Sequence, residues 1–357
     1  MDGRTSVDGL TELTSGIDGV YLSGGSPVPG GLIRDLEQAK ALAQEVGSEV
    51  PFEPLGAEFT VAGSGMARYR FCLKHPFGQI GITESTALPP MWVQVRASYL
   101  HAVGHHAAVG WFSDLAGHLL GRTPRWKVSR LDLFSDVQGW DLTADDRDRF
   151  VCRPKDLVTH ESDGAFTGFQ FGRRTSGTFS ARVYDKTIEM ARGTHDWWFE
   201  KWGSRFRPGE RVLRVEFEIR RQALSQFELM YSDETFDAVD RMWAYCTDRW
   251  LTYRTRSGDS TRSRWPVAPE WSCIRSSELR GTAIGLDRVY AHSAAGSLRQ
   301  IMGGLRGYVA SAGAFTGAES LEDAAAAVLR LLRADEEASG VSFAGRLNDK
   351  RRKLRSA

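Results

Sequence analysis

Three segments near the middle of the chain alternate ionisable and apolar side chains, and this pattern constrains the fold most. They are SRLDLFSD (129–136), SARVYDK (180–186) and VLRVEFEIRR (212–221). Successive side chains of a β-strand point to opposite faces, so a period of two puts the ionisable groups on one face and the apolar groups on the other. The pattern predicts three strands of a mostly antiparallel sheet, with a core beneath one face and a polar surface on the other.

The remaining segments add helices to this sheet and predict an α+β fold. The periodicity of 32–47 and of 101–121 is helical, and each segment ends at a glycine. Helices dominate after about residue 222. The other predicted elements are a disordered leader over 1–16, strands at 19–24, 58–63, 66–75, 79–84, 91–100, 167–174 and 179–190, a short acidic helix over 143–150, and a polar loop or linker over 255–271.

These elements divide the chain into four parts. We expect the leader at 1–16, a main domain over 17–255, a linker over 256–286 and a helical C-terminal region over 287–357. The last residues, DKRRKLRSA, form a basic tail. Such a run is usually solvated, and contact with DNA is the alternative.

Composition limits the classes of partner and compartment. The 46 Lys and Arg residues nearly balance the 45 Asp and Glu residues, so any binding of nucleic acid has to come from local basic clusters. The four cysteines are far apart, which predicts reduced thiols rather than a disulfide framework or zinc site. There is no secretory signal or apolar run long enough to cross a membrane, and we expect a cytoplasmic protein.

The polar faces of the three segments carry groups suited to phosphodiester chemistry. Arg182, Tyr184 and Lys186 fall at every second position, which places a phenol between two cations. Cations beside a phenol would lower its pKa from about 10 and hold a phosphate. The acids on the neighbouring strands could hold Mg²⁺ or Mn²⁺. The alternative is a solvated face of cross-strand ion pairs, each worth only ~0.2–1 kcal/mol.

Five segments in order resemble the replication initiation factor family of rolling-circle plasmids, the Rep-trans type, which also includes conjugative relaxases. They are SRLDLFSDVQGW, TGFQFGRRTSG, ARVYDKTIEM, WWFEKW and RVEFEIRRQAL. The resemblance runs from about residue 90 to 255, and the GVYLSG segment near the N-terminus looks like actinobacterial members. It implies that 17–255 is a metal-dependent nicking domain whose tyrosine attacks one strand at a plasmid origin. A 5′-phosphotyrosyl bond and a 3′-hydroxyl primer would result.

The resemblance also implies roles for individual residues. Tyr184 would be the nucleophile, although some members carry a further tyrosine where this chain has Phe179 and Ser180. The implied catalytic cations are Arg182 and Lys186, the implied metal ligands are Asp132, Glu216, Glu218 and Asp136, and the implied phosphate-binding residues are Arg130, Arg173, Arg174, Ser176, Arg214 and Arg220. Expected partners are origin DNA with an exposed single strand, a host helicase and a second copy of the chain, with no membrane.

Two other functions remain open from the sequence. One is a conjugative relaxase with the same chemistry. The other is an initiator that binds the origin without cutting it. Three further groups could contact DNA or metal, although packing or solvation is at least as good a reading of each: the histidines 101, 105 and 106, the tryptophans 197, 198 and 202, and the arginines of the loop 254–264.

Overall fold

The computed structural model describes residues 9–174, 177–193, 196–280, 286, 294–340 and 342–348. The chain divides into two compact units, Met1–Arg288 and Val289–Ala357. The strands named below lie in the first unit, and the second is helical where it is described. The predicted α+β class, with a large antiparallel sheet and a helix-rich C-terminal part, is confirmed.

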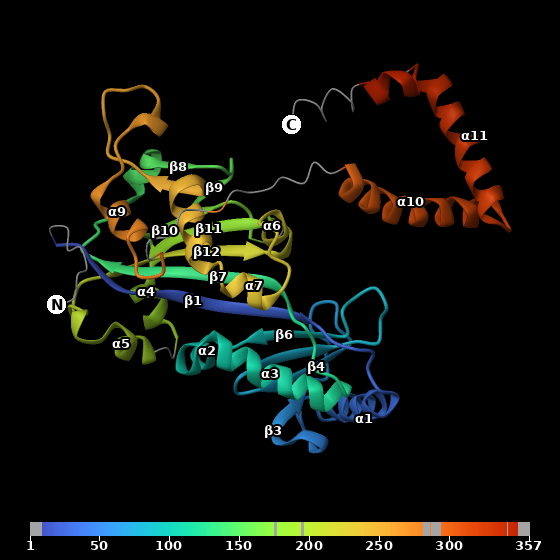
Figure 1. Ribbon diagram of the computed structural model, residues 1–357, viewed down its shortest axis with the longest axis horizontal. Coiled ribbons are helices and arrows are strands. Elements are labelled where there is room, and N and C mark those ends of the chain that lie inside the picture. Colours follow the sequence, from blue (N-terminus) through green and yellow to red (C-terminus); the bar gives the residue numbers. More distant parts are fainter. Residues whose placement is uncertain are drawn as a thin grey trace. The chain divides into compact units, whose positions relative to one another are not determined.

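An 11-stranded sheet runs through the described part of the first unit, and its neighbouring strands are antiparallel (Figure 1). From edge to edge the strands are β2 (Val50–Phe52), β3 (Gly56–Val61), β4 (Phe71–His75), β5 (Gly78–Ile82), β6 (Met91–Val95), β1 (Thr11–Gly24), β7 (Lys127–Gln138), β12 (Val212–Arg220), β11 (Phe179–Asp185), β10 (Ala165–Phe171) and β9 (Leu157–Ser162). A separate pair joins β8 (Phe150–Cys152) to β13 (Leu251–Tyr253).

Helices pack on both faces of the sheet, although not evenly. In chain order those of the first unit are α1 (Gly30–Val46), α2 (Ala97–Val103), α3 (His105–Leu120), α4 (Lys186–Ala191), α5 (Trp197–Trp202), α6 (Arg221–Gln226), α7 (Ser232–Phe236), α8 (Val239–Tyr245) and α9 (Pro269–Arg275). The helices α6, α7 and α8 lie on the apolar face of β7 and β12, whereas α4 and α5 pack against Phe134 on the polar face.

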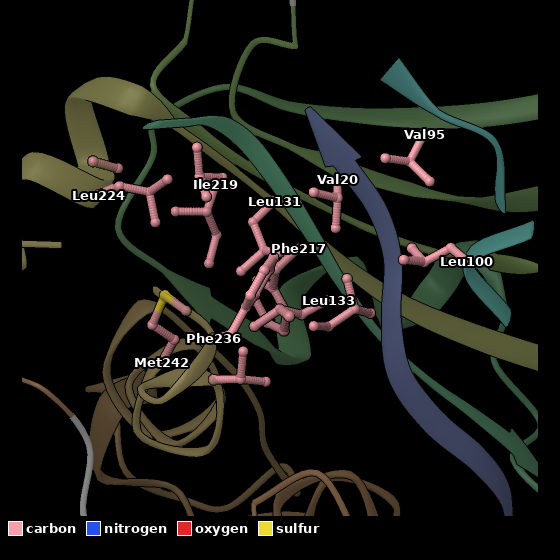
Figure 2. Close-up of a cluster of buried hydrophobic side chains, with 14 of the residues drawn as sticks. Val20, Val95, Leu100, Leu131, Leu133, Phe217, Ile219, Leu224, Phe236 and Met242 are labelled. Carbon is pink, nitrogen blue, oxygen red and sulfur yellow. The ribbon is translucent and has the colours of Figure 1, made fainter. Parts of the chain in front are cut away.

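The core confirms the period of two read from the sequence. Leu131 and Leu133 of β7 and Phe217 of β12 are fully buried on one face. Figure 2 shows them in one cluster with Phe236 and Met242, which come from α7 and α8. Burial of these side chains stabilises the sheet and fixes which face remains polar.

Four of the predicted boundaries are wrong. The leader expected over 1–16 overlaps β1, which begins at Thr11. The strand expected over 91–100 ends at Val95, and the following helical segment is divided at Gly104, which has a φ of +82°. The strand expected over 179–190 ends at Asp185, whose side chain accepts a hydrogen bond from the Ile188 amide and begins α4. The expected linker contains α9, which packs in the core of the first unit.

The second unit contains the helices α10 (Ala294–Thr316) and α11 (Leu321–Ser339), which contact each other. Ser320 caps α11 by accepting a hydrogen bond from the Asp323 amide. The basic tail expected at the C-terminus lies outside the described residues. Among the described helices, none combines the length and apolar composition that crossing a bilayer requires.

Candidate functional site

The strand register brings the polar residues of β11, β12 and β7 together on one face. Arg182 lies opposite Glu216, and Glu218 lies opposite Asp132. These acids are less than 6% exposed, so the face is not the solvated surface that the alternative reading assumed. The ion pairs of that reading do form, but they are largely buried. Burying charges costs free energy even when they are paired, and such clusters are therefore candidates for function.

Tyr184 lies on this face near the end of β11. Its phenol donates a hydrogen bond of 3.1 Å to Glu216 Oε2, and Arg182 Nη2 donates one of 2.7 Å to Glu216 Oε1. The guanidinium carbon of Arg182 lies 4.7 Å from the centre of the Tyr184 ring. One carboxylate therefore holds the phenol and the nearest cation at the same time.

The pKa of Tyr184 is shifted upwards, whereas the sequence predicted a downward shift. Burial and the charge of Glu216 raise the pKa of Tyr184 well above its usual 10, and Arg214 and Arg182 do not compensate. Burial also acts to raise the pKa of Glu216, but Arg182 and Arg214 outweigh it and hold that pKa below its usual range. The ground state is thus a neutral phenol beside an ionised carboxylate, which is the arrangement of an acid and its proton acceptor.

A second cluster surrounds Asp132 and Glu218. Arg130 donates to both oxygens of Asp132 at 2.8 and 2.7 Å, and it also pairs with Glu218 at 3.0 Å. Arg174 and Arg220 reach Glu218 at 3.3 and 2.6 Å. Burial, together with the charges of Glu216 and Glu218, raises the pKa of Asp132 to about 7 despite Arg130.

Asp136 and Arg214 form a fully buried pair and not a ligand-binding site. Arg214 donates to both oxygens of Asp136 at 2.7 and 2.8 Å and to Asp18 at 3.0 Å. Trp202 Nε1 donates to Asp136 at 2.9 Å. Neither member of the pair is exposed, so the expected metal role of Asp136 and phosphate role of Arg214 do not fit this structure.

Asp18 and His101 belong to this network; Asp18 was not selected from the sequence, and His101 was considered there only as one of three clustered histidines. Asp18 lies where the register of β1 against β7 shifts between Ile17 and Gly19. Its carboxylate lies 3.0 Å from His101 Nε2 on α2. A simple alternation cannot reveal Asp18, because the irregularity changes which residues of β1 share a face.

Three other expected phosphate or catalytic residues lie elsewhere or are not described. Lys186 follows the end of β11, pairs with Glu189 and lies 5.2 Å from the centre of the Trp198 ring. The expected face of three alternating residues therefore contains Arg182 and Tyr184 only. Arg173 is exposed and pairs with Asp156 at 3.1 Å. Ser176 lies outside the described residues.

A cleft of about 400 Å³ opens beside the phenol. It is lined by Tyr184 and Arg182 of β11 together with Arg174, Arg192 and His160. The side chains of Arg174 and Arg182 are 37% and 27% exposed, so their guanidiniums are accessible to an anionic ligand. Glu161, Asp185 and Glu189 line the same cleft, so its individual arginines, rather than an overall positive charge, would hold a phosphodiester next to the phenol.

The remaining candidates are mostly structural. Trp198 and Trp202 are buried against Phe134 and Asp136, which supports a packing role. His105 and His106 pack against the Phe236 ring in tilted and edge-to-face arrangements and do not join the site. In the arginine-rich loop, the arginines 254, 256, 262 and 264 all bond to neighbouring protein groups.

The carboxylates of the polar face are ligands suited to a hard divalent cation, but each already pairs with an arginine that occupies its oxygens. Asp132, Glu216 and Glu218 lie on adjacent strands, and the pKa of Asp132 is raised mainly by burial and to a smaller extent by the charges of Glu216 and Glu218, which a cation would offset. The backbone of Gly19 approaches so closely that an added Cβ would lie 2.5 Å from Asp132 Oδ2. Among the residues that the structure describes, no three acids, histidines or cysteines are grouped as metal ligands. Binding would therefore require Arg130 or Arg182 to move away from its carboxylate.

Comparison with known proteins gives one solved structure to report. The chain is similar to a rolling circle replication initiator protein from Geobacillus stearothermophilus, with a TM-score of 0.46 and 16% sequence identity, over 78% of this chain and 100% of that chain. Overall similarity of this degree carries no argument about activity. No protein-family model and no curated protein matches the chain.

Proposed function

We propose that the chain is a DNA nicking and closing enzyme that initiates rolling-circle replication of a plasmid. The observation that carries this proposal is the phenol of Tyr184, which is hydrogen-bonded to an ionised Glu216 and flanked by Arg182 in a cleft that other arginines also line. A neutral tyrosine with a proton acceptor in contact is suited to attack phosphorus. The ordered motifs that resemble replication initiation factors point to the same chemistry.

The proposed reaction is a transesterification that needs no co-reactant. Tyr184 Oη forms a bond to phosphorus, and the bond between phosphorus and the 3′-oxygen breaks. The phenol's proton passes to Glu216, and the leaving oxygen takes up a proton from water to become a 3′-hydroxyl. Arg182 is placed to stabilise charge on the phosphate, and Arg174 also lines the cleft. The covalent 5′-phosphotyrosyl bond conserves the energy needed for rejoining.

A divalent cation, Mg²⁺ or Mn²⁺, is part of this proposal. Asp132 and Glu218 would hold it, with Glu216 beside them, and it would neutralise charge that develops on the phosphate. Arg130 and Arg220 remain the proposed contacts to neighbouring phosphates once they leave their carboxylates. The other proposed partners are a host helicase and a second copy of the chain, in the cytoplasm.

The test is a nicking assay on supercoiled plasmid carrying DNA from the gene's own replicon, with Mg²⁺, Mn²⁺ or EDTA. The variants are Tyr184→Phe and, as a matched control, Tyr99→Phe, which removes a phenol that stacks on Phe77 outside the site. We expect nicking with protein attached to the 5′ end in the wild type and in Tyr99→Phe. Tyr184→Phe should give none.

Each of the other outcomes would indicate a different nucleophile or a different function for this chain. Nicking that persists in Tyr184→Phe would move the nucleophile elsewhere. Origin binding that survives chelation, without nicked product under any condition, would indicate a non-enzymatic initiator. Nicking at a transfer origin but not at a replication origin would indicate a conjugative relaxase.

A further inference from the structure

The face that carries Tyr184 continues across β1, β6 and β5, although the register of β1 against β7 shifts between Ile17 and Gly19 and between Tyr21 and Leu22. Tyr21 of β1 lies opposite Arg130 of β7 on one side and opposite Gln94 of β6 on the other. Gln94 in turn lies opposite Gln79 of β5. Residues directly opposite each other on neighbouring antiparallel strands share a face. The catalytic face and this second face are therefore halves of one surface.

The two halves differ in chemistry. The half formed by β7, β12 and β11 is rich in ion pairs, as described above. On β1, β6 and β5 the corresponding positions hold aromatic rings and amides: Tyr21, Trp92, Gln94 and Gln79. All four are half-buried, so solvent reaches this face. We name this group of four residues the aromatic face.

The rings of the aromatic face are held in a row. The centres of the Tyr21 and Trp92 rings are 5.6 Å apart, and Trp92 stacks on Tyr69 at 6.3 Å. Gln94 Nε2 donates a hydrogen bond of 3.1 Å to the Tyr21 phenol. Tyr69 lies so close over Gly81 that an added Cβ there would be 2.7 Å from its ring. These contacts fix the rings before any ligand arrives, which lowers the entropic cost of stacking on them.

Arg130 joins the two halves. Its guanidinium carbon lies 4.7 Å from the centre of the Tyr21 ring, while its nitrogens bind Asp132 and Glu218. Tyr21 lies three strands from Tyr184 across the sheet, and it is opposite Arg130, six residues along β7 from Asp136, which is level with Tyr184. With strands about 4.8 Å apart and a rise of about 3.3 Å per residue, Tyr21 is roughly 25 Å from Tyr184, and Trp92 on β6 is farther away. A strand with its scissile phosphate at Tyr184 would therefore place bases a few nucleotides away over Tyr21 and Trp92.

We propose that the aromatic face binds single-stranded DNA next to the scissile phosphate by stacking unpaired bases on Trp92 and Tyr21. Half-exposed rings bind bases without regard to sequence, because every base has a π-face. The amides of Gln94 and Gln79 offer hydrogen bonds to base edges. The placement of the scissile phosphate rests on the proposed function, whereas single-strand binding by these residues is measurable without it.

The test measures binding of a labelled oligothymidylate by fluorescence anisotropy, without divalent cation so that no cleavage occurs. Trp92→Ala should weaken binding by roughly 5- to 150-fold, the range for loss of one stacked base. Trp92→Phe keeps a ring and should retain most of the affinity. Phe199→Ala removes a ring of α5 that is 45% exposed and should have no effect.

Two further measurements separate stacking from misfolding. An oligonucleotide of the same length with abasic sites should bind the wild type and Trp92→Ala equally, because it has no bases to stack. The salt dependence of binding should be the same in both proteins, since a lost stack removes no phosphate contact. Equal affinity of wild type and Trp92→Ala for oligothymidylate would overturn the proposal, as would an equal loss on the abasic strand.

The outcome is independent of the nicking assay. Loss of single-strand binding in Trp92→Ala, in a protein that never nicks, would support the aromatic face and refute the proposed enzyme. Nicking that depends on Tyr184, with unchanged single-strand binding in Trp92→Ala, would support the proposed enzyme and refute the aromatic face as a binding site.

Discussion

Replacing Arg214 by methionine should destabilise the first unit by about 3–5 kcal/mol, the range for breaking a buried ion pair. Arg214 is fully buried, and its guanidinium makes bonds of 2.7, 2.8 and 3.0 Å to Asp136 and Asp18. Methionine fills similar space but leaves the Asp136 carboxylate buried without its cation. Since domains are stable by only about 5–15 kcal/mol, the loss would be a large fraction of the total.

Urea denaturation followed by tryptophan fluorescence measures this loss. All 11 tryptophans precede residue 288, so the signal reports the first unit alone. The matched control is Arg173→Met, which removes an exposed arginine paired with a half-exposed Asp156 and should cost at most ~1 kcal/mol. The double variant Arg214→Met/Asp136→Asn should be less destabilised than the sum of its single variants, by about 0.5–3 kcal/mol.

The pH dependence gives the same prediction a second test. Burial acts to raise the pKa of Asp18, but Arg214 and His101 outweigh it and lower that pKa below its usual 3.8. A depressed carboxyl pKa contributes stability above the unfolded value, and the contribution is lost as the pH falls through the folded one. The difference between wild type and Arg214→Met should therefore shrink below about pH 4. A loss of less than ~1 kcal/mol at neutral pH would refute the view that this pair supports the sheet.

Three further predictions concern the site. Glu216→Gln should lower the pKa of Tyr184, because the charge of Glu216 contributes to raising that pKa; spectrophotometric titration of the phenol measures the shift. The same variant should reduce nicking by about 10²–10⁴-fold in the nicking assay, because it removes the proton acceptor. Asp132 has a pKa raised from 3.8 to about 7, so the folded state binds the extra proton and stability should fall as the pH rises through that range; Asp132→Asn should remove this slope in urea titrations. Gly19→Ala should cost about 1–3 kcal/mol in the same assay, because its Cβ would lie 2.5 Å from Asp132 Oδ2.

Local patterns predicted the faces of the sheet well but not where its strands end. The alternation in β7 and β12 is long, and a shift by one residue would expose Leu131 or Phe217, so the register is strongly specified. The end of β11 depends on one capping side chain. Asp185 could have been recognised as a helix N-cap, but the apolar residues after it continue the strand-like pattern.

Partner choice within the polar face could not be predicted from the sequence. β7 and β12 carry both signs of charge, and the spacing alone allows several pairings. The pairing that forms removes Asp136 and Arg214 from solvent while leaving Arg182 half-exposed. The buried part of the face is the part against which α4 and α5 pack, around Phe134. This packing brings together segments that are far apart in the chain, and a local sequence pattern cannot predict such contacts.

The direction of the Tyr184 pKa shift shows that burial determines the protonation state of the proposed nucleophile. Two cations near a phenol in water would favour the phenolate, which is what the sequence suggested. In the folded chain, burial penalises the phenolate, and so does the charge of Glu216, whose carboxylate accepts a hydrogen bond of 3.1 Å from the phenol. The nucleophile is therefore held protonated until Glu216 accepts its proton. A phosphate that attracts Arg182 would free Glu216 from its ion pair and make it a stronger base, so that substrate binding itself activates the tyrosine.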